Sequence, residues 1–304
     1  MQKDTLYKLL DHCFNKSSIK EFRKYIKMFH NIDRWILTSD YCFDNKNKFN
    51  NVASFLLLPI FNNTNSEYII PELGRNALYL DEFIELLKEI QKKDIKEIRT
   101  VDKRFITLLN SNFYFSFNFF LTGNIKISID EIRQLLNNII IMLEMWKCNS
   151  CSNNIDFYNT TIKKIKIILN DTNKTTYSKK LLINMIIIIK LASYITMILV
   201  REHPQIKSCL FISDRDNMTT CYDRIFYYLF EVYRHDVCNY YVKEKNYKLD
   251  NILITFDNNN FDANELIRIP DFFCWNTSIF RIKHWAHRRK RKIYTNIKRS
   301  YHKK

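Results

Sequence analysis

The chain has 304 residues, of which 46% are hydrophobic and 15% aromatic, so it can form a globular protein with a substantial core. Lysine and arginine number 48 against 32 acidic residues, which gives a formal net charge of +16. The sequence contains two glycines, Gly74 and Gly123. This composition excludes the glycine-rich loops that bind phosphates or dinucleotides and the glycine-flanked nucleophile turn of serine hydrolases.

Basic charge is concentrated in residues 281–304. This segment holds eleven of the 48 basic residues and no acidic residue, which leaves 37 basic against 32 acidic residues elsewhere. Such a segment suits the phosphate backbone of a nucleic acid or an anionic membrane surface, and we predict nucleic acid. An AT-rich genome, which favours Asn, Lys, Ile, Phe and Tyr, is the alternative origin of the charge. The predicted contacts are Arg288, Arg289, Lys290, Arg291 and Lys292.

The cysteines and the N-terminal residues indicate a reducing compartment. Eight cysteines occur, and Cys148 and Cys151 form a C-x-x-C sequence. A zinc ribbon needs a second close pair, which the sequence lacks. Residues 1–12 mix acidic and basic groups and lack the apolar stretch of a signal peptide. We therefore predict free thiols and a cytoplasmic location.

Hydrophobic periodicity predicts two groups of strands separated by a long helical stretch. Ser18 and Ser128 are each followed three residues later by glutamate, Glu21 and Glu131, which is the spacing of a helix capping box. The first two strands are joined by a polar connection and predict a hairpin. In chain order we predict helix 5–30, strands 34–39 and 52–61, helix 79–93, one or two strands within 96–121, helices 128–147, 157–170 and 178–202, strand 208–213, helix 219–233, strand 251–256 and a helix beginning near Asp271.

Residues 181–200 are apolar enough to be compared with a membrane span. The length of this stretch suits a bilayer, but Lys190 lies at its centre and Asn184 near its start. A central lysine costs about 2.5–3.5 kcal/mol on insertion scales. We therefore predict a buried helix of a globular protein and no membrane span.

The order of these elements predicts an α/β fold interrupted by helices. The two groups of strands would form one core, and the helices between them an insertion. The predicted parts are an N-terminal helical segment at 1–30, the first part of the α/β core at 31–126, a helical insertion at 127–202, the second part of the core at 203–280 and a basic tail at 281–304.

Three acidic positions stand out because each lies where a strand ends or a helix begins. Asp40 ends the first predicted strand, Asp214 follows a later one with Asp216 two residues beyond, and Asp271 opens the last helix. Ligands gather at strand ends in α/β sheets, so these carboxylates are expected to converge. Converging carboxylates repel one another unless a cation neutralises them.

Mg²⁺ is the cation that such a group would suit, with Mn²⁺ as a substitute. It prefers hard oxygen ligands and is held by one or two carboxylates together with substrate phosphates. A pair of such ions stabilises the attacking and leaving oxygens of a phosphodiester. The pattern therefore indicates nuclease chemistry. The alternative is structural, because aspartate is common in turns and at helix N-termini, where Asp214, Asp216 and Asp271 would act as caps or offset the helix dipole.

The order of these motifs resembles the DUF3800 family. In that family a DES-type strand end, an internal aspartate and a late QLAD segment carry the acidic residues. Here WILTSDYC supplies Asp40, CLFISDRD supplies Asp214 and Asp216, and IRIPDFFCW supplies Asp271. The resemblance implies an RNase H-like mixed sheet flanked by helices and a metal-dependent nuclease or a relative of one. The sequence departs from the pattern at Tyr41 and Cys42, at Arg268 and at Pro270.

The sequence therefore predicts a Mg²⁺-dependent or Mn²⁺-dependent nuclease acting on DNA or RNA. Asp40, Asp214 and Asp271 are the expected catalytic and metal-binding residues, and Asp216 is a further metal ligand. Two alternatives stay open. The first is a non-catalytic nucleic-acid-binding protein that uses the basic tail, and the second is a helix-rich structural protein in which the aspartates are caps.

Overall fold

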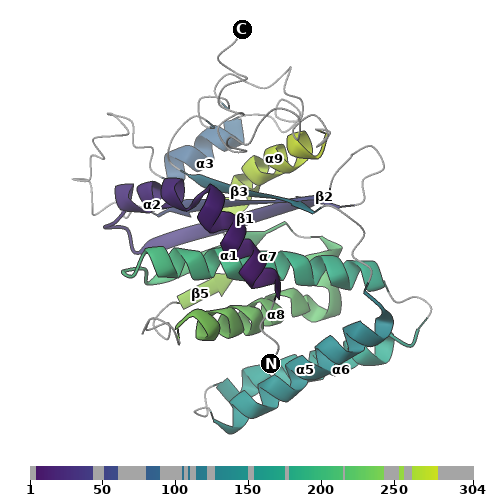
Figure 1. Ribbon diagram of the computed structural model, residues 1–304. Helices are drawn as coiled ribbons and strands as arrows, with labels where there is room; N and C mark the ends of the chain where they lie inside the picture. The colour runs from purple at the N-terminus through teal and green to yellow at the C-terminus, as the bar shows by residue number, and fades with distance from the viewer. Residues whose placement is uncertain are drawn as a thin grey trace. The chain divides into compact units, whose positions relative to one another are not determined.

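The chain is a mixed α/β protein, in agreement with the predicted fold class (Figure 1). Two compact units can be distinguished by their internal packing. Unit 1 comprises Met1–Thr122, Leu199–Ser213 and Lys248–Lys304, and unit 2 comprises Gly123–Ile198 and Asp214–Tyr247. The computed structural model describes residues 5–43, 51–60, 80–89, 105, 109, 114–121, 127–149, 154–174, 178–214, 216–242, 253–256 and 262–279.

Unit 1 is built on a five-stranded mixed sheet with the strand order β3-β2-β1-β4-β5. The predicted hairpin is confirmed, because β2 pairs antiparallel with β1, and β3 pairs antiparallel with β2. On the other side of β1, β4 and β5 are added in parallel. The strands are β1 (Arg34–Cys42), β2 (Asn51–Pro59), β3 (Phe115–Leu121), β4 (Ser208–Ser213) and β5 (Leu253–Phe256).

One face of this sheet is covered by α1 (Thr5–Ser17) and α2 (Ile19–Met28) through aromatic packing. The ring centroids of Phe22 and Phe115 lie 5.1 Å apart in an edge-to-face arrangement. Trp35 of β1 is fully buried, and its Nε1 donates to the carbonyl of Ile32 at 3.2 Å. Aromatic side chains of this size contribute more to a core than any other type.

The predicted capping box at Ser18 is wrong, and the helical hydrogen bonds continue through this residue. The amide of Ser18 donates to Phe14 O at 2.9 Å, and the amide of Phe22 donates to Ser18 O at 2.9 Å. Ser18 is buried and its side chain makes no capping bond, with Oγ lying 3.1 Å from Ser17 Oγ. The expected single helix at 5–30 is observed as α1 and α2, which are divided at Ser18 but joined by these backbone bonds.

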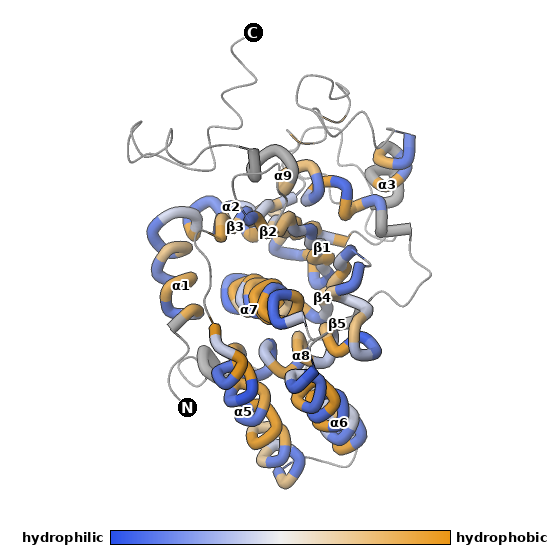
Figure 2. Tube along the Cα trace, turned by 90° about the vertical axis from the view of Figure 1, so that its right-hand side faces the viewer, coloured by the Kyte–Doolittle hydropathy of each residue, from blue (hydrophilic) through white to orange (hydrophobic). Residues whose placement is uncertain are grey.

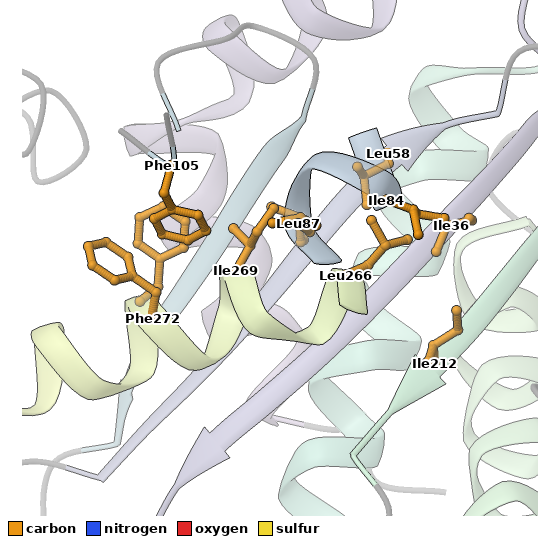
Figure 3. Close-up of a cluster of buried hydrophobic side chains, with 11 residues drawn as sticks. Ile36, Leu58, Ile84, Leu87, Phe105, Ile212, Leu266, Ile269 and Phe272 are labelled. Carbon is orange, nitrogen blue, oxygen red and sulfur yellow. The ribbon is translucent and has the colours of Figure 1, made fainter. Parts of the chain in front are cut away.

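The opposite face of the sheet is covered by α3 (Leu80–Glu89), the 3-10 helix η5 (Asp262–Ile267) and α9 (Arg268–Ile279) (Figure 3). The last helix begins at Arg268, three residues before the predicted start. Pro270 is tolerated because the first turn of a helix does not need its amide donors. The apolar core between α9 and the strands consists of Ile36, Leu56, Leu58, Ile84, Leu87, Phe105, Ile212, Leu266, Ile269, Phe272 and Phe273.

A buried histidine lies beside Trp35 in unit 1. His203 follows directly after α7 (Lys179–Glu202), is 2% exposed, and places its Nε2 2.6 Å from Ile32 O. Because a carbonyl can only accept, Nε2 carries the proton and donates it. Burial lowers the pKa of His203, although the carbonyls of Ile32 and Phe29 oppose the shift.

This histidine predicts that the protein loses stability in mild acid. The lowered pKa means that the unfolded chain binds the proton more tightly, so the free energy of unfolding falls as pH drops below about 6.5. The slope contributed by one such group is at most about 1.4 kcal/mol per pH unit. Urea unfolding between pH 7.5 and 5.5 should show this loss, and His203→Gln should flatten it. Parallel curves for the two proteins would contradict the prediction.

Unit 2 is helical and contains α5 (Ile129–Cys148), α6 (Ile155–Asp171) and α8 (Asn217–Val242), with Lys179–Ile198 of α7. The predicted capping box of α5 is confirmed. Ser128 Oγ accepts from the amide of Glu131 at 3.1 Å, and Glu131 Oε2 accepts from the amide of Ser128 at 2.6 Å. The hydrogen bond from the backbone amide of Ser128, together with the Ser128 side chain, lowers the pKa of the Glu131 carboxyl.

Within the described residues, α7 is the one helix long and apolar enough to cross a membrane (Figure 2). Of its most apolar 18-residue window, 83% is buried inside the protein. Lys190 Nζ lies 5.1 Å from the ring centroid of Tyr233, so its charge meets an aromatic face. These features agree with the predicted buried helix.

The helix α8 is interrupted by a short left-handed turn. Tyr222, Asp223 and Arg224 have φ values of 47°, 52° and 62°. Each non-glycine residue in this conformation costs about 1–2 kcal/mol, so other contacts must offset the cost of three in succession. The helix predicted at 219–233 is thus correct in position, while its interior conformation could not be inferred from periodicity.

Candidate active site

On the α9 side of the sheet, the side chains change from apolar to polar along the strands. Alternate residues of a strand share a face, so Ile36, Thr38 and Asp40 of β1 all lie on the α9 side. Ile36 belongs to the apolar core, whereas Thr38 is a fully buried hydroxyl and Asp40 is a half-buried carboxylate. The same change occurs on β2, where Leu58 and Leu56 are followed at the other end by Ser54.

Asp40 lies in a row of polar residues across three strands. In the strand register, Asp40 is opposite Ser54, and Ser54 is opposite Asn118 of β3. Ser54 Oγ donates to Asn118 Oδ1 at 2.7 Å, and the exposed fractions of these two residues are 0% and 9%. Burying hydroxyl and amide groups is costly unless they are hydrogen-bonded. Asp40, Ser54 and Asn118 therefore form a polar end to the otherwise apolar α9 side of the sheet.

The helix α9 packs directly over this row through a cysteine. Cys274 Sγ donates to Asp40 O at 3.1 Å and lies 3.7 Å from Val52 O. Burial raises the pKa of Cys274 well above its usual value, and the Asp40 carboxylate adds to the shift. The thiol is therefore protonated and suited to donate rather than to bind a soft metal. Asp271 lies one helical turn before Cys274 on α9.

The carboxyl end of β4 meets β1 next to Asp40. Ser39 Oγ donates to Ser213 Oγ at 2.9 Å, and these two residues are the last pair of the parallel ladder. Asp40 and Asp214 each follow directly after this pair in the chain. The first strand does not end at Asp40 as predicted, because Tyr41 and Cys42 continue to pair with β2. Asp40 is instead the first residue beyond the pairing with β4.

Asp216 caps the first turn of α8. Its Oδ1 accepts from the amides of Met218 at 2.8 Å and Thr219 at 3.1 Å. Thr219 Oγ1 lies 2.9 Å from Asp214 O, within reach to donate. This is the structural role that the sequence offered as the alternative for Asp216. Asp214 itself is exposed.

The oxygen atoms around Asp40 suit a hard divalent cation. Carboxylate, hydroxyl and amide oxygens are the ligands of Mg²⁺ and Mn²⁺, and the protonated thiol of Cys274 is not one. Asp40 and Asp271 belong to unit 1, and Asp214 and Asp216 to unit 2. Among the residues that the structure describes, no group of three or more His, Cys, Asp and Glu side chains forms a ready-made metal site.

Several polar residues of this region were not identified from the sequence. Ser54 and Asn118 interrupt the apolar strands VASFLLLP and FSFNFFL, and that interruption is the signal that could have found them. Cys151 and the predicted nucleic-acid contacts of the basic tail lie outside the described part of the chain. These contacts are Arg288, Arg289, Lys290, Arg291 and Lys292.

Comparison of the chain with models of known protein families, with curated proteins and with solved structures finds no match. The fold defines the chain as a mixed α/β protein. One end of its sheet carries polar residues, among them Asp40.

Proposed function

We propose that the protein is a metal-dependent nuclease that hydrolyses phosphodiester bonds of DNA or RNA at the end of β1 and β4. The observation that carries the proposal is the pairing of Ser39 with Ser213. Asp40 and Asp214 each follow this pair directly in the chain, and Cys274, one helical turn after Asp271, bonds to Asp40 O. Carboxylates gathered at neighbouring strand ends are typical of sites that bind a cation and a phosphate.

In this proposal Asp40, Asp214 and Asp271 hold Mg²⁺ or Mn²⁺. The ion supplies Lewis-acid stabilisation of charge on the phosphate and lowers the pKa of a bound water. In support of this, Asp40 pairs with Ser54 of β2 directly after the last pair of β1 with β4, and Cys274, one helical turn after Asp271, bonds to Asp40 O. Ser54 and Asn118 hold the neighbouring strand end rigid through their buried hydrogen bond. Asp216 acts as the cap of α8 rather than as a ligand.

The strand arrangement supports an RNase H-like interpretation of the core. Three antiparallel strands, β3, β2 and β1, are extended by the parallel strands β4 and β5, with helices on the sheet. The resemblance to DUF3800 implies a mixed sheet flanked by helices, with its first acidic residue on an early strand. We propose the same arrangement here, with Asp40 in that position.

Residues 281–304 supply the affinity for the substrate backbone in this proposal. Their eleven basic residues, including Arg288, Arg289, Lys290, Arg291 and Lys292, neutralise phosphates without reading sequence. A non-catalytic nucleic-acid-binding protein would use the same segment. The thiols of Cys13, Cys42, Cys148, Cys209, Cys221 and Cys274 are free, which supports a cytoplasmic location.

The test is cleavage of labelled single-stranded and double-stranded DNA and RNA with Mg²⁺ or Mn²⁺, with a chelator as the metal-free control. We expect metal-dependent cleavage that Asp214→Asn reduces by about a hundredfold or more. Cleavage that survives both the chelator and the substitution would refute the proposal. Absence of cleavage, together with salt-sensitive binding that is lost on deleting 281–304, would establish the binding protein instead.

A further inference from the structure

The left-handed turn of α8 is held in place by a lysine from another helix. Lys164 of α6 donates through Nζ to the carbonyl of Asp223 at 2.6 Å and also pairs with the Asp223 carboxylate. The side chain of Lys164 is 8% exposed, while that of Asp223 is 90% exposed. The buried ammonium therefore depends on the turn for its partners, and the turn depends on the ammonium.

The surroundings of Lys164 favour this arrangement. Its Nζ lies 4.8 Å from the ring centroid of Tyr228, which in turn stacks on Phe157 with centroids 5.5 Å apart. Burial raises the pKa of Tyr222, at the start of the turn, and the carboxylate of Asp171 at the end of α6 adds to the shift. The charged groups that face Lys164 and the turn are thus Asp223, Asp171 and the neighbouring Arg224.

The alternative conformation of residues 222–224 is right-handed, which would make α8 a continuous helix. In that helix the carbonyl of Asp223 would accept from the amide of Tyr227, four residues later, and would be withdrawn from Lys164. Three non-glycine residues would then leave the unfavourable left-handed region. The carbonyl of Asp223 thus accepts from Lys164 in the left-handed state and would accept from the Tyr227 amide in the continuous helix. An element with two stable conformations needs such alternative partners.

We propose that Tyr222–Arg224 is a conformational switch, held in its left-handed state by Lys164 and released to a continuous helix when that contact is lost. Asp214 and residues 216–220, on the N-terminal side of the turn, would rotate with the helix, because Thr219 Oγ1 bonds to Asp214 O and Asp216 caps the first turn. The switch therefore changes the orientation of Asp214. It does not rest on the proposed nuclease function, because it concerns the backbone of α8 alone.

The experiment reads the sign of φ at Tyr222 in the full-length protein, from backbone couplings and chemical shifts of isotopically labelled tyrosine. The unaltered protein should show a positive φ, and Lys164→Met should show a negative one. Lys163→Met, at the exposed neighbouring position of α6, is the matched control and should keep the positive value. A positive φ retained in folded Lys164→Met would overturn the proposal.

A second pair of variants keeps the test decisive if Lys164→Met does not fold. Arg224 is exposed, so Arg224→Gly and Arg224→Ala change the backbone preference without disturbing the core. Glycine tolerates positive φ at no steric cost. The folding equilibrium constant of Arg224→Gly, measured by urea unfolding, should therefore be about fivefold higher than that of Arg224→Ala. In an ordinary helix glycine has the opposite effect. Stability lower for Arg224→Gly than for Arg224→Ala would refute the left-handed state and the switch with it.

Discussion

Replacing Asp40 by asparagine is expected to lower metal-dependent cleavage by about a hundredfold or more. The substitution preserves the size of the side chain but removes the negative charge that would hold the cation, whose contribution is several kcal/mol of charge stabilisation. Asp40 is half-buried near the end of the central strand β1, so little rearrangement can bring a substitute carboxylate to its place. The measurement is the single-turnover cleavage rate over a series of Mg²⁺ concentrations.

Asp33→Asn is the matched control at the opposite end of the same strand. Asp33 precedes β1, and its carboxylate pairs with the exposed Lys207 at 2.7 Å. An exposed pair of this kind contributes about 0–1 kcal/mol to stability and has no role in the proposed site. Equal rates for Asp33→Asn and Asp40→Asn would show that Asp40 is not a ligand, even in a protein that cleaves.

Trp35→Ala is expected to cost about 3–5 kcal/mol of the free energy of unfolding, the largest effect on stability that we predict. Trp35 is fully buried, and its ring contacts Tyr25, Phe29 and His203 at centroid distances of 5.9, 6.2 and 5.6 Å. Alanine would leave a cavity lined by these rings. Urea unfolding followed by circular dichroism measures the loss.

Ile141→Ala serves as the control for this stability prediction. Ile141 lies on α5 and is 59% exposed, so its removal should change the free energy of unfolding by no more than about 0.5 kcal/mol. A cost for Trp35→Ala as small as this would mean that the packing of α2 on β1 contributes little to stability.

The strands could be predicted well because their apolar stretches are short and bounded by polar residues. β4 begins at Ser208 and ends at Ser213, as the sequence indicates. The helix starts were less certain, since they depend on side-chain bonds that a motif does not guarantee. Ser128 and Ser18 have the same motif, but only Ser128 caps a helix, because Ser18 is buried within continuing helical hydrogen bonds.

The candidate site could be predicted only in part, because strand order and register are properties of the fold. Asp40 and Asp214 were found from their positions at strand ends, and the parallel pairing of β1 with β4 explains why those positions are related. Ser54, Asn118 and Cys274 come from three other elements, and their relation to Asp40 depends on the register and on the packing of α9. No spacing in the sequence encodes those contacts.

The parallel pairing of β1 with β4 has a consequence for the newly made chain. Ser39 and Ser213, which bond across this pair, are separated by 174 residues. A ribosome that adds about 5–20 residues per second would deliver β1 and β2 many seconds before β4. During that interval one edge of β1 is unpaired and apolar, which is the kind of surface that aggregates. We therefore expect the protein to depend on chaperones during synthesis, although this edge of β1 is covered by β4 in the folded sheet.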